Sequence, residues 1–248
     1  MEFLTGVITS RHGRQDNEDY FGFQTIEGRG CWAVADGLGG HVGGQIASRL
    51  AVETAMASCQ ESSELSVEAL ARHLETAHHA LLARQAEDPG LESMRTTLVL
   101  LMAQAELALW GHVGDSRLYL FRENQLIFQT RDHSVSQALA NAGEIAPEDV
   151  RFHEDRNHLL RALGQEGDLR PTIAPDKQVI QAGDAFLLCT DGFWEYVMEE
   201  EMQGALAIAD TPVAWIKEME RVLQHRAKER QNDRADNYTA ISIFVRGI

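Results

Sequence analysis

The sequence lacks any long apolar run. No stretch approaches the roughly 18 consecutive apolar residues that cross a bilayer, and Met1–Gly6 shows no basic segment followed by an apolar one, the pattern of a secretory signal. Cysteine is also scarce, because the chain has three cysteines, an odd number without metal-type spacing. We therefore expect no membrane insertion and a cytoplasmic protein whose thiols stay reduced.

Basic residues are outnumbered. The 22 lysines and arginines face 38 aspartates and glutamates, which gives a formal net charge of −16. Nucleic-acid binding normally depends on Lys and Arg side chains that neutralise the phosphate backbone. This balance predicts no nucleic-acid partner and disfavours a metal-dependent nuclease.

Linker-like segments rich in Pro, Gly and Ser are missing from the 248 residues, which include only 5 prolines. A compact chain of this length buries roughly 70 to 75% of its unfolded surface, and 44% hydrophobic residues suffice for such a core. We therefore expect one domain, residues 1–248. The segment 143–157 is rich in Gly, Pro and charge and has little periodicity, which predicts a lid or surface loop.

Short apolar or alternating runs predict strands, and apolar residues at helical spacing predict helices. The predicted strands are Phe3–Thr9, Tyr20–Ile26, Cys31–Ala35, Leu98–Met102, Leu107–Trp110, Leu118–Phe121, Leu126–Phe128, Gln178–Ile180, Ala185–Cys189 and Tyr238–Val245. The predicted helices are Gly44–Ala57, Val67–Gln85, Ser134–Asn141 and one that starts at Thr211-Pro212. This order favours an α+β fold of mostly antiparallel sheets covered by helices.

Four aspartates stand at predicted strand ends. Asp36, Asp115 and Asp191 each follow an apolar run, and Asp236 precedes one. A single Asp-Gly turn is most often only a turn, because Gly tolerates positive φ and Asp bonds its own backbone. Four such residues in one domain predict converging like charges, which repel unless a cation neutralises them.

Carboxylate and carbonyl oxygens suit Mg²⁺, Mn²⁺ or Ca²⁺, whereas Zn²⁺ prefers Cys and His. The chain has no zinc motif among its ten histidines and no EF-hand loop, so a binuclear Mg²⁺ or Mn²⁺ centre is the leading hypothesis. Arg14 stands close to Glu18 and Asp19, and arginine is a natural bidentate partner of phosphate. Taken alone, this run is an ordinary charged loop with internal ion pairs. Beside a binuclear centre it indicates hydrolytic phosphate chemistry.

The chain resembles the metal-dependent Ser/Thr protein phosphatases of the PPM/PP2C family in their compact bacterial form, and the resemblance covers essentially all of the sequence. The matching runs are Arg14-x-x-Asn17-Glu18-Asp19, Asp36-Gly37-Leu38-Gly39-Gly40-His41, Thr96-Thr97-Leu98, Gly114-Asp115-Ser116-Arg117, Asp132-His133-Ser134, Leu160-Arg161-Ala162-Leu163-Gly164, Thr190-Asp191-Gly192 and Asp236-Asn237-x-Thr239. Each run alone is weak evidence, whereas the whole set in family order is specific. The resemblance implies a four-layer αββα sandwich, in which two central antiparallel sheets are flanked by helix pairs.

The resemblance also implies two core Mn²⁺ or Mg²⁺ ions and a weaker third ion. Carried over by position, Asp36 would bridge the two core ions and the Gly37 carbonyl would bind one of them. Asp191 and Asp236 would complete the other. Asp115, together with Asp191, would bind the third ion.

The implied activity is hydrolysis of phosphoserine and phosphothreonine in proteins, in opposition to a cognate bacterial Ser/Thr kinase in signal transduction. Arg14 would hold the phosphate, while Glu18 and Asp19 would orient metal-bound water. Two cations would activate a water that attacks phosphorus in line, so that no phosphoenzyme forms. A pseudophosphatase or partner-switching phosphoprotein-binding module is the alternative, and it would be expected to lack metal carboxylates, none of which is missing here.

The chain departs from the family pattern at two places that concern chemistry. Many eukaryotic relatives carry a His directly after the first Asp-Gly, as a candidate general acid, whereas this chain has Leu38. His41 is nearby, with packing or helix capping as its alternative role. Bacterial relatives tend to read Met-Gly-Thr-Thr where this chain has Arg95 in place of the Gly, which either adds positive potential near the site or caps a surface strand.

Overall fold

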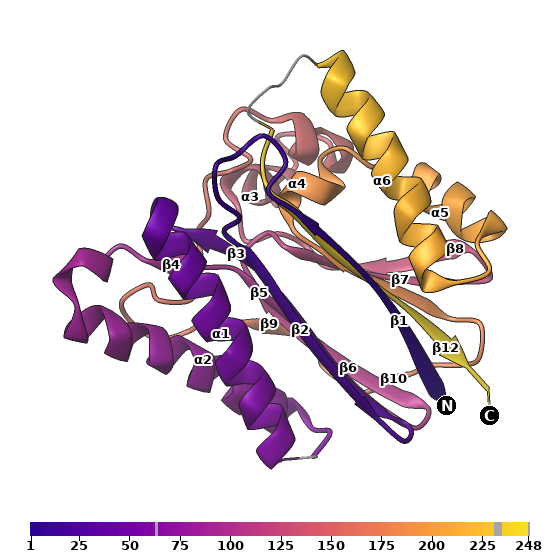
Figure 1. Cartoon of the computed structure of the whole chain (residues 1–248), viewed down its shortest axis with the longest axis horizontal. Coiled ribbons are helices and arrows are strands. Elements are labelled where there is room, and N and C mark those ends of the chain that lie inside the picture. The colour runs from indigo at the N-terminus through magenta and orange to yellow at the C-terminus, as the bar shows by residue number, and fades with distance from the viewer. Residues whose placement is uncertain (63, 231–234, 248) are drawn as a thin grey trace.

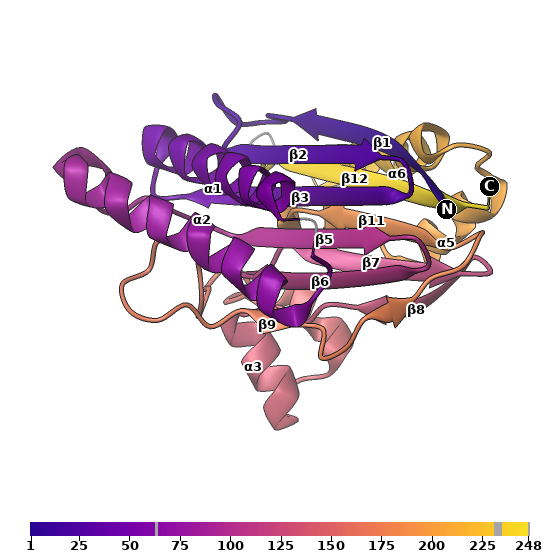
Figure 2. The ribbon, with the colours of Figure 1, turned by 90° about the horizontal axis from the view of Figure 1, so that it is seen from below.

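Two antiparallel sheets pack face to face at the centre of the molecule, with helices on both outer faces (Figures 1 and 2). The computed structural model describes residues 1–62, 64–230 and 235–247. Each predicted strand and helix is present, and the predicted αββα sandwich is confirmed. None of the helices within these ranges is long and apolar enough to cross a membrane.

Strands from distant parts of the sequence make up each sheet. The five-stranded sheet has the order β1-β12-β11-β7-β8 and consists of β1 (Glu2–Ser10), β7 (Arg117–Arg122), β8 (Gln125–Gln129), β11 (Ala185–Cys189) and β12 (Tyr238–Arg246). The seven-stranded sheet has the order β10-β6-β5-β3-β2, with β4 beside β3 and β9 beside β6. Its strands are β2 (Asp19–Ile26), β3 (Arg29–Leu38), β4 (Arg95–Thr96), β5 (Leu98–Gln104), β6 (Leu107–Val113), β9 (Thr172–Ile173) and β10 (Gln178–Val179).

Two groups of helices cover the outer faces. The helices α1 (His41–Glu61) and α2 (Val67–Glu87) pack on the seven-stranded sheet. The five-stranded sheet is covered by α4 (Asp191–Trp194), α5 (Glu199–Ile208) and α6 (Pro212–Glu229), and α6 begins with the predicted Thr211 cap and Pro212. The remaining helices are α3 (Val135–Ala142) and the 3₁₀ helices η1 (Pro89–Leu91) and η2 (Pro147–Phe152).

The middle strands of the five-stranded sheet are buried on both faces, which explains why their sequences read as unbroken apolar runs. Successive strand side chains point to opposite faces. In β11, Phe186 and Leu188 belong to the core between the two sheets, whereas Leu187 and Cys189 belong to the core under α4–α6. The fully buried Trp215 of α6 anchors this second core.

The segment 143–157 contains more regular structure than its sequence indicates. Pro147–Phe152 forms η2, and the Arg151 side chain in it is buried. Its guanidinium donates to both carboxylate oxygens of Glu199, at 2.5 and 2.7 Å, and to the carbonyl of Val197 at 2.9 Å. These bonds attach the segment to the start of α5. Its role as a lid stays a prediction.

Two buried histidines stack near one end of the sheets. The rings of His112 and His133 have centroids 4.6 Å apart and planes only 12° from parallel. His133 Nδ1 accepts the backbone N–H of Gly114 at 3.2 Å, so the ring proton lies on Nε2, 2.8 Å from Thr172 Oγ1. Burial, followed by the neighbouring His112 and Arg161, lowers the pKa of His133 to about 3.

We predict that His133 loses its contribution to the stability of the fold in mild acid. The unfolded chain binds a proton at His133 near pH 6.5 and the folded protein only near pH 3. This contribution to stability is therefore complete above about pH 6.5 and is lost by up to about 1.4 kcal/mol per pH unit below it. Because His133→Asn cannot titrate at this position, the unfolding free energy of the parent should fall relative to that of the variant as the pH is lowered from about 6.5, as measured by urea denaturation. Parallel curves for the two proteins would contradict this prediction.

Candidate active site

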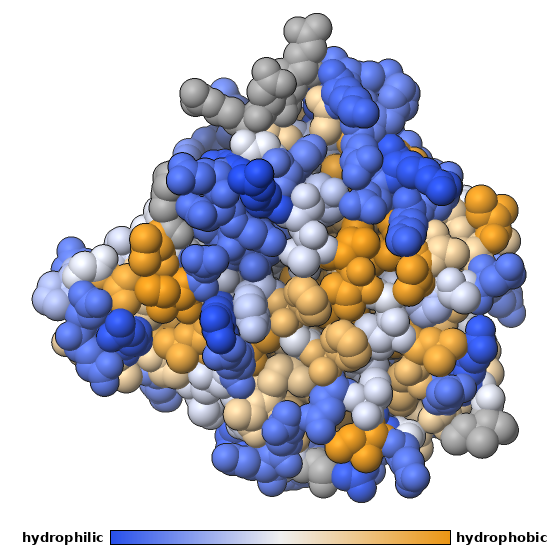
Figure 3. All heavy atoms as spheres, in the orientation of Figure 1, coloured by the Kyte–Doolittle hydropathy of each residue, from blue (hydrophilic) through white to orange (hydrophobic). Residues whose placement is uncertain are grey.

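A cavity of about 310 Å³ opens at the end of the sandwich where strands of both sheets meet. Hydrophilic side chains gather at the same end of the molecule, where the loop between β1 and β2 lies (Figure 3). The cavity is lined by Arg14, Glu18, Asp36, Gly37, Leu38, Gly39, Gly40, Asp115, Asn157, Leu159, Asp191, Asp236 and Asn237. Every predicted site residue except Asp19 is in this wall. Asp19 is buried and lies opposite Asp36 in the pairing of β2 with β3.

The four aspartates reach the cavity from separate elements. Asp36 lies near the end of β3, and Asp115 lies in the turn after β6. Asp191 is the first residue of α4, directly after β11, and Asp236 stands two residues before β12. The predicted convergence of strand-end carboxylates is therefore present in the structure.

Burial makes this convergence electrostatically costly. The pKa of Asp36 is raised well above its usual range, mainly because burial removes solvent and next because Asp191 carries like charge. The pKa of Asp191 is also raised well above its usual range, first by burial and then by the charge of Asp115. Burial also raises the pKa of Asp19 to about 7 and that of Asp115 to about 8. A positive group that entered the cavity would stabilise the negative charge of these carboxylates.

Buried hydroxyls hold the carboxylates in place. Thr96 Oγ1 donates to the carbonyl of Asp36 at 2.7 Å, and Thr97 Oγ1 accepts the backbone N–H of Asp36 at 2.9 Å. Thr190 Oγ1 donates to Asp19 Oδ2 at 2.9 Å. The three threonines of the Thr-Thr and Thr-Asp-Gly runs therefore position the aspartates and do not line the cavity themselves.

Asn237 fixes the loop that carries Arg14. Its Nδ2 donates to the carbonyls of Arg11 and Asp16 at 3.0 and 2.9 Å, and its Oδ1 accepts the backbone N–H of Glu18 at 2.8 Å. This one buried side chain ties the loop between β1 and β2 to the start of β12. No role for Asn237 is predicted from the sequence, although this residue stands inside a matching run.

Arg14 contacts one of the predicted metal ligands. Its Nη2 donates to Asp236 Oδ2 at 2.7 Å, and both side chains are about half exposed, at 52% and 42%. The guanidinium is therefore held at the cavity mouth, where its other N–H groups are available to an anion.

Two glycines allow the end of β3, the start of α1 and Glu18 to approach one another closely. A Cβ at Gly37 would overlap the carbonyl oxygen of Gly44, and a Cβ at Gly44 would overlap Glu18 Oε2. The backbone N–H of Gly37 donates to the carbonyl of Glu18 at 3.1 Å. The side chain of His41, the first residue of α1, lies outside the described part of the structure.

A buried ion pair supports the turn that holds Asp115. Arg117 donates to both oxygens of Asp132 at 2.8 Å, and its guanidinium stacks 3.5 Å from the Trp194 ring. Trp194 Nε1 in turn donates to the carbonyl of Asp115 at 2.9 Å. The Arg of the Gly-Asp-Ser-Arg run and the Asp of the Asp-His-Ser run thus act together in support of the site.

The donor set fits a hard divalent cation. Carboxylates from four elements and the Gly37 backbone line one cavity, and hard cations prefer such oxygens. Asp19 Oδ1 and Asp115 Oδ1 are buried without a hydrogen-bond partner among the described residues. Within the same residues, no three His, Cys, Asp or Glu side chains already form a closed ligand set. The carboxylates therefore surround the cavity and leave space between them.

Comparison with known proteins identifies relatives over most of the chain. A model of the family described as Protein phosphatase 2C matches residues 9–237. The serine/threonine phosphatase stp of Listeria welshimeri is 35% identical over 213 residues, which cover 83% of this chain and 82% of that protein. The Mycobacterium tuberculosis serine/threonine phosphatase PstP/Ppp has a crystal structure that matches with a TM-score of 0.85 at 28% identity, covering 99% of both chains. The catalytic domain of PstP in complex with two manganese ions matches with a TM-score of 0.78 at 29% identity, again over 99% of both chains.

We predict that Asn237→Ala releases the loop between β1 and β2. Loss of the buried side-chain bonds should lower the unfolding free energy by about 1 to 3 kcal/mol. Because Arg11 and Arg14 lie in this loop, the folded variant should be nicked there by trypsin at least several times faster than the parent. Fragment masses and urea denaturation measure the two effects. Asn141→Ala, on the surface of α3, serves as the control, and equal nicking of both variants would remove Asn237 from this role.

Proposed function

Since this chain belongs to the protein phosphatase 2C family and is a serine/threonine protein phosphatase, we propose that the cavity at the shared end of its two sheets is the active site. The observation that supports this proposal is that residues far apart in the sequence, from Arg14 to Asp236, line one cavity. An arginine and a set of carboxylates together match what hydrolysis of a phosphate ester requires. The substrates are phosphoserine and phosphothreonine in proteins.

We further propose that the cavity holds two Mn²⁺ or Mg²⁺ ions, as the related PstP domain holds two manganese ions. Asp36, the Gly37 carbonyl, Asp191 and Asp236 are the proposed ligands. When bound, such cations lower the pKa of water and polarise the phosphoryl group. Asp115 is the proposed ligand of a weaker third ion, and its unpartnered buried oxygen supports that role.

The remaining site residues are proposed to bind the phosphate group and to orient water. Arg14 is proposed to bind the phosphate oxygens, because its guanidinium is fixed by Asp236 at the cavity mouth. Glu18 lines the wall, where bonds to its backbone hold it in place. Its proposed role is to orient water, and Asp19 is proposed to assist from behind the wall. No covalent phosphoenzyme is needed in this scheme.

The alternative of a pseudophosphatase or partner-switching module receives no support from the site. Such a protein would be expected to lack metal-binding carboxylates, and all of the predicted ones line the cavity or, in the case of Asp19, lie directly behind it.

The cellular setting is proposed on chemical grounds. Cys31, Cys59 and Cys189 are all free thiols, which fits the reducing cytoplasm. The phosphoprotein substrates must be supplied by a Ser/Thr kinase, and we propose that a cognate kinase of this type is a partner.

Arg14→Ala tests the phosphate-binding role. Loss of a charge-assisted contact should raise KM for a phosphothreonine peptide by about one to two decades, equivalent to about 1.5 to 3 kcal/mol. Assays with Mn²⁺ should show this effect, and a chelator should abolish turnover in both proteins. Calorimetric Mn²⁺ affinity should persist, because removal of the guanidinium leaves Asp236 available. Loss of Mn²⁺ binding with KM unaltered would mean that Arg14 is structural.

Asp115→Ala tests a role in protonation of the leaving oxygen. Leu38 has no proton to donate, so we propose that the proton would come from a water at the third ion, which Asp115 would help to hold. The variant should keep two tightly bound Mn²⁺ ions by calorimetry but lose more activity toward a phosphopeptide than toward para-nitrophenyl phosphate, whose good leaving group needs little protonation. Equal losses on both substrates would show that Asp115 has no such role.

A further inference from the structure

A second hollow continues from the active-site cavity along the surface. This side groove, of about 490 Å³, shares four lining residues with the cavity, namely Leu38, Gly39, Asn157 and Leu159. Its other lining residues are Ser93, Arg95, His158, Arg161, Ala162 and Gln165. A peptide whose phosphorylated residue occupies the cavity therefore has a path into the side groove.

The side groove is basic in a chain whose net charge is −16. Its lining has two arginines, Arg95 and Arg161, and no carboxylate. Arg95 is exposed and forms no ion pair or side-chain hydrogen bond with any described residue. Arg161 donates to the carbonyl of Arg170 at 3.1 Å and lies 3.4 Å from His133 Nε2, so no acidic group neutralises it either.

Backbone pairing fixes Arg95 beside the active site. In the pairing of β4 with β3, Arg95 lies opposite Leu38, and Thr96 lies opposite Gly37. Thr96 is buried and donates to the carbonyl of Asp36 at 2.7 Å. The Arg95 side chain thus projects from backbone that is bonded directly to the proposed metal-binding strand.

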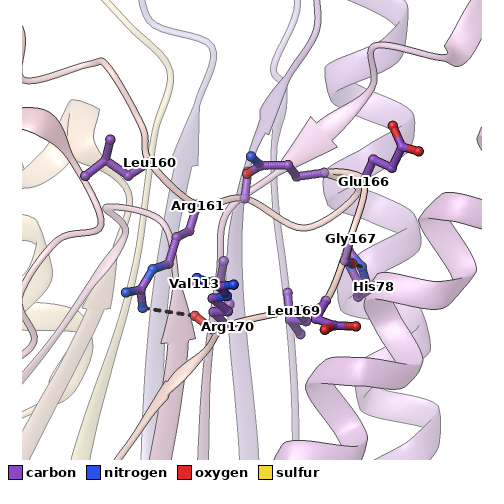
Figure 4. A pocket seen from close by; sticks show the side chains of 11 residues that line it. His78, Val113, Leu160, Arg161, Glu166, Gly167, Leu169 and Arg170 are labelled. Carbon is purple, nitrogen blue, oxygen red and sulfur yellow. Dashed lines mark hydrogen bonds between the residues drawn. The ribbon is translucent and has the colours of Figure 1, made fainter.

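The excess of positive charge over negative charge ends with the side groove. Beyond Arg161 a third hollow follows, which shares Arg161, Ala162 and Gln165 with the side groove (Figure 4). There the Arg161 side chain lies on the wall opposite Glu166, and the carboxylates of Glu166 and Asp168 balance the guanidinium groups of Arg161 and Arg170. An anionic group would therefore be more strongly favoured in the side groove than farther along.

We propose that the side groove binds the substrate segment beside the phosphorylated residue and selects an anionic side chain there. That side chain is Asp, Glu or a second phosphorylated residue, since each presents oxygens that a guanidinium binds. The proposal rests on the active-site assignment made above. Arg95, which stands where bacterial relatives tend to have Gly, makes this selectivity a property of this chain.

The test compares phosphothreonine peptides that differ only in the flanking residues. One has Gln on both sides, one has Glu in the same positions, and one has a second phosphothreonine. The parent should favour the anionic peptides in kcat/KM by roughly three- to tenfold, the range expected for one or two partly exposed ion pairs. The preference should shrink in high salt, because mobile ions screen exposed charges. Preference for the doubly phosphorylated peptide alone would identify phosphate as the selected group.

Arg95→Gln should remove most of this preference. Arg29→Gln is the matched control, because Arg29 is an exposed arginine at the opposite end of β3 and its loss changes the net charge equally. The control should keep the parent's ratio of kcat/KM values. Two results would overturn the proposal. One is equal kcat/KM values of the parent for all three peptides, and the other is an equal change in peptide preference in Arg95→Gln and Arg29→Gln. Turnover of the phosphothreonine peptide flanked by Gln, together with the Arg14→Ala result, tests the active-site assignment separately.

Discussion

Mutual repulsion among buried carboxylates is the constraint on which the arrangement of this molecule depends. Aspartates from both sheets converge on one cavity, and burial raises the pKa of Asp36 and Asp191. Such a cluster does not hold itself together, so neighbouring elements must hold it. Bonds from Thr96, Thr97 and Asn237 do this on one side, while the glycines between β3 and α1 permit the close approach. The two large apolar cores supply the stability that the cluster opposes.

The sequence could predict the longer strands, four of the helices and the members of the site, but not the bonds that hold the site together. Apolar runs such as Ala185–Cys189 identified buried strands because both faces of those strands are covered. The helix α5 was missed, since it opens with Glu199-Glu200-Glu201 and most of its apolar residues stand together in Ala205–Ile208, too short a run to show a helical repeat. Short pieces such as β4 and β9 carry no periodicity at all.

Contacts between distant residues were beyond the reach of local patterns. Asn237 bonds to Asp16, and Arg14 pairs with Asp236, although each pair is separated by more than 200 positions in the chain. The Asp132–Arg117 pair likewise joins two motifs that sequence analysis treated separately. The signal that could have found these partners is their place inside the matching runs, next to residues that line the cavity. A place inside a matching run indicates that a residue belongs to the site. Only the folded structure shows whether its side chain lines the cavity or holds another site residue in place.

The pairing of β1 with β12 brings the first and last strands of the fold together along their full length, from Glu2 opposite Arg246 to Ser10 opposite Tyr238 (Figure 1). Because β12 lies between β1 and β11, it is an interior strand whose loss would separate its neighbours. The same segment begins just after Asp236 and Asn237, which complete the cavity and fix its arginine loop. A shortened chain that ends before Asp236 therefore has neither a continuous five-stranded sheet nor a complete cavity. Proteolytic removal of this segment would switch the enzyme off in one step instead of weakening it gradually.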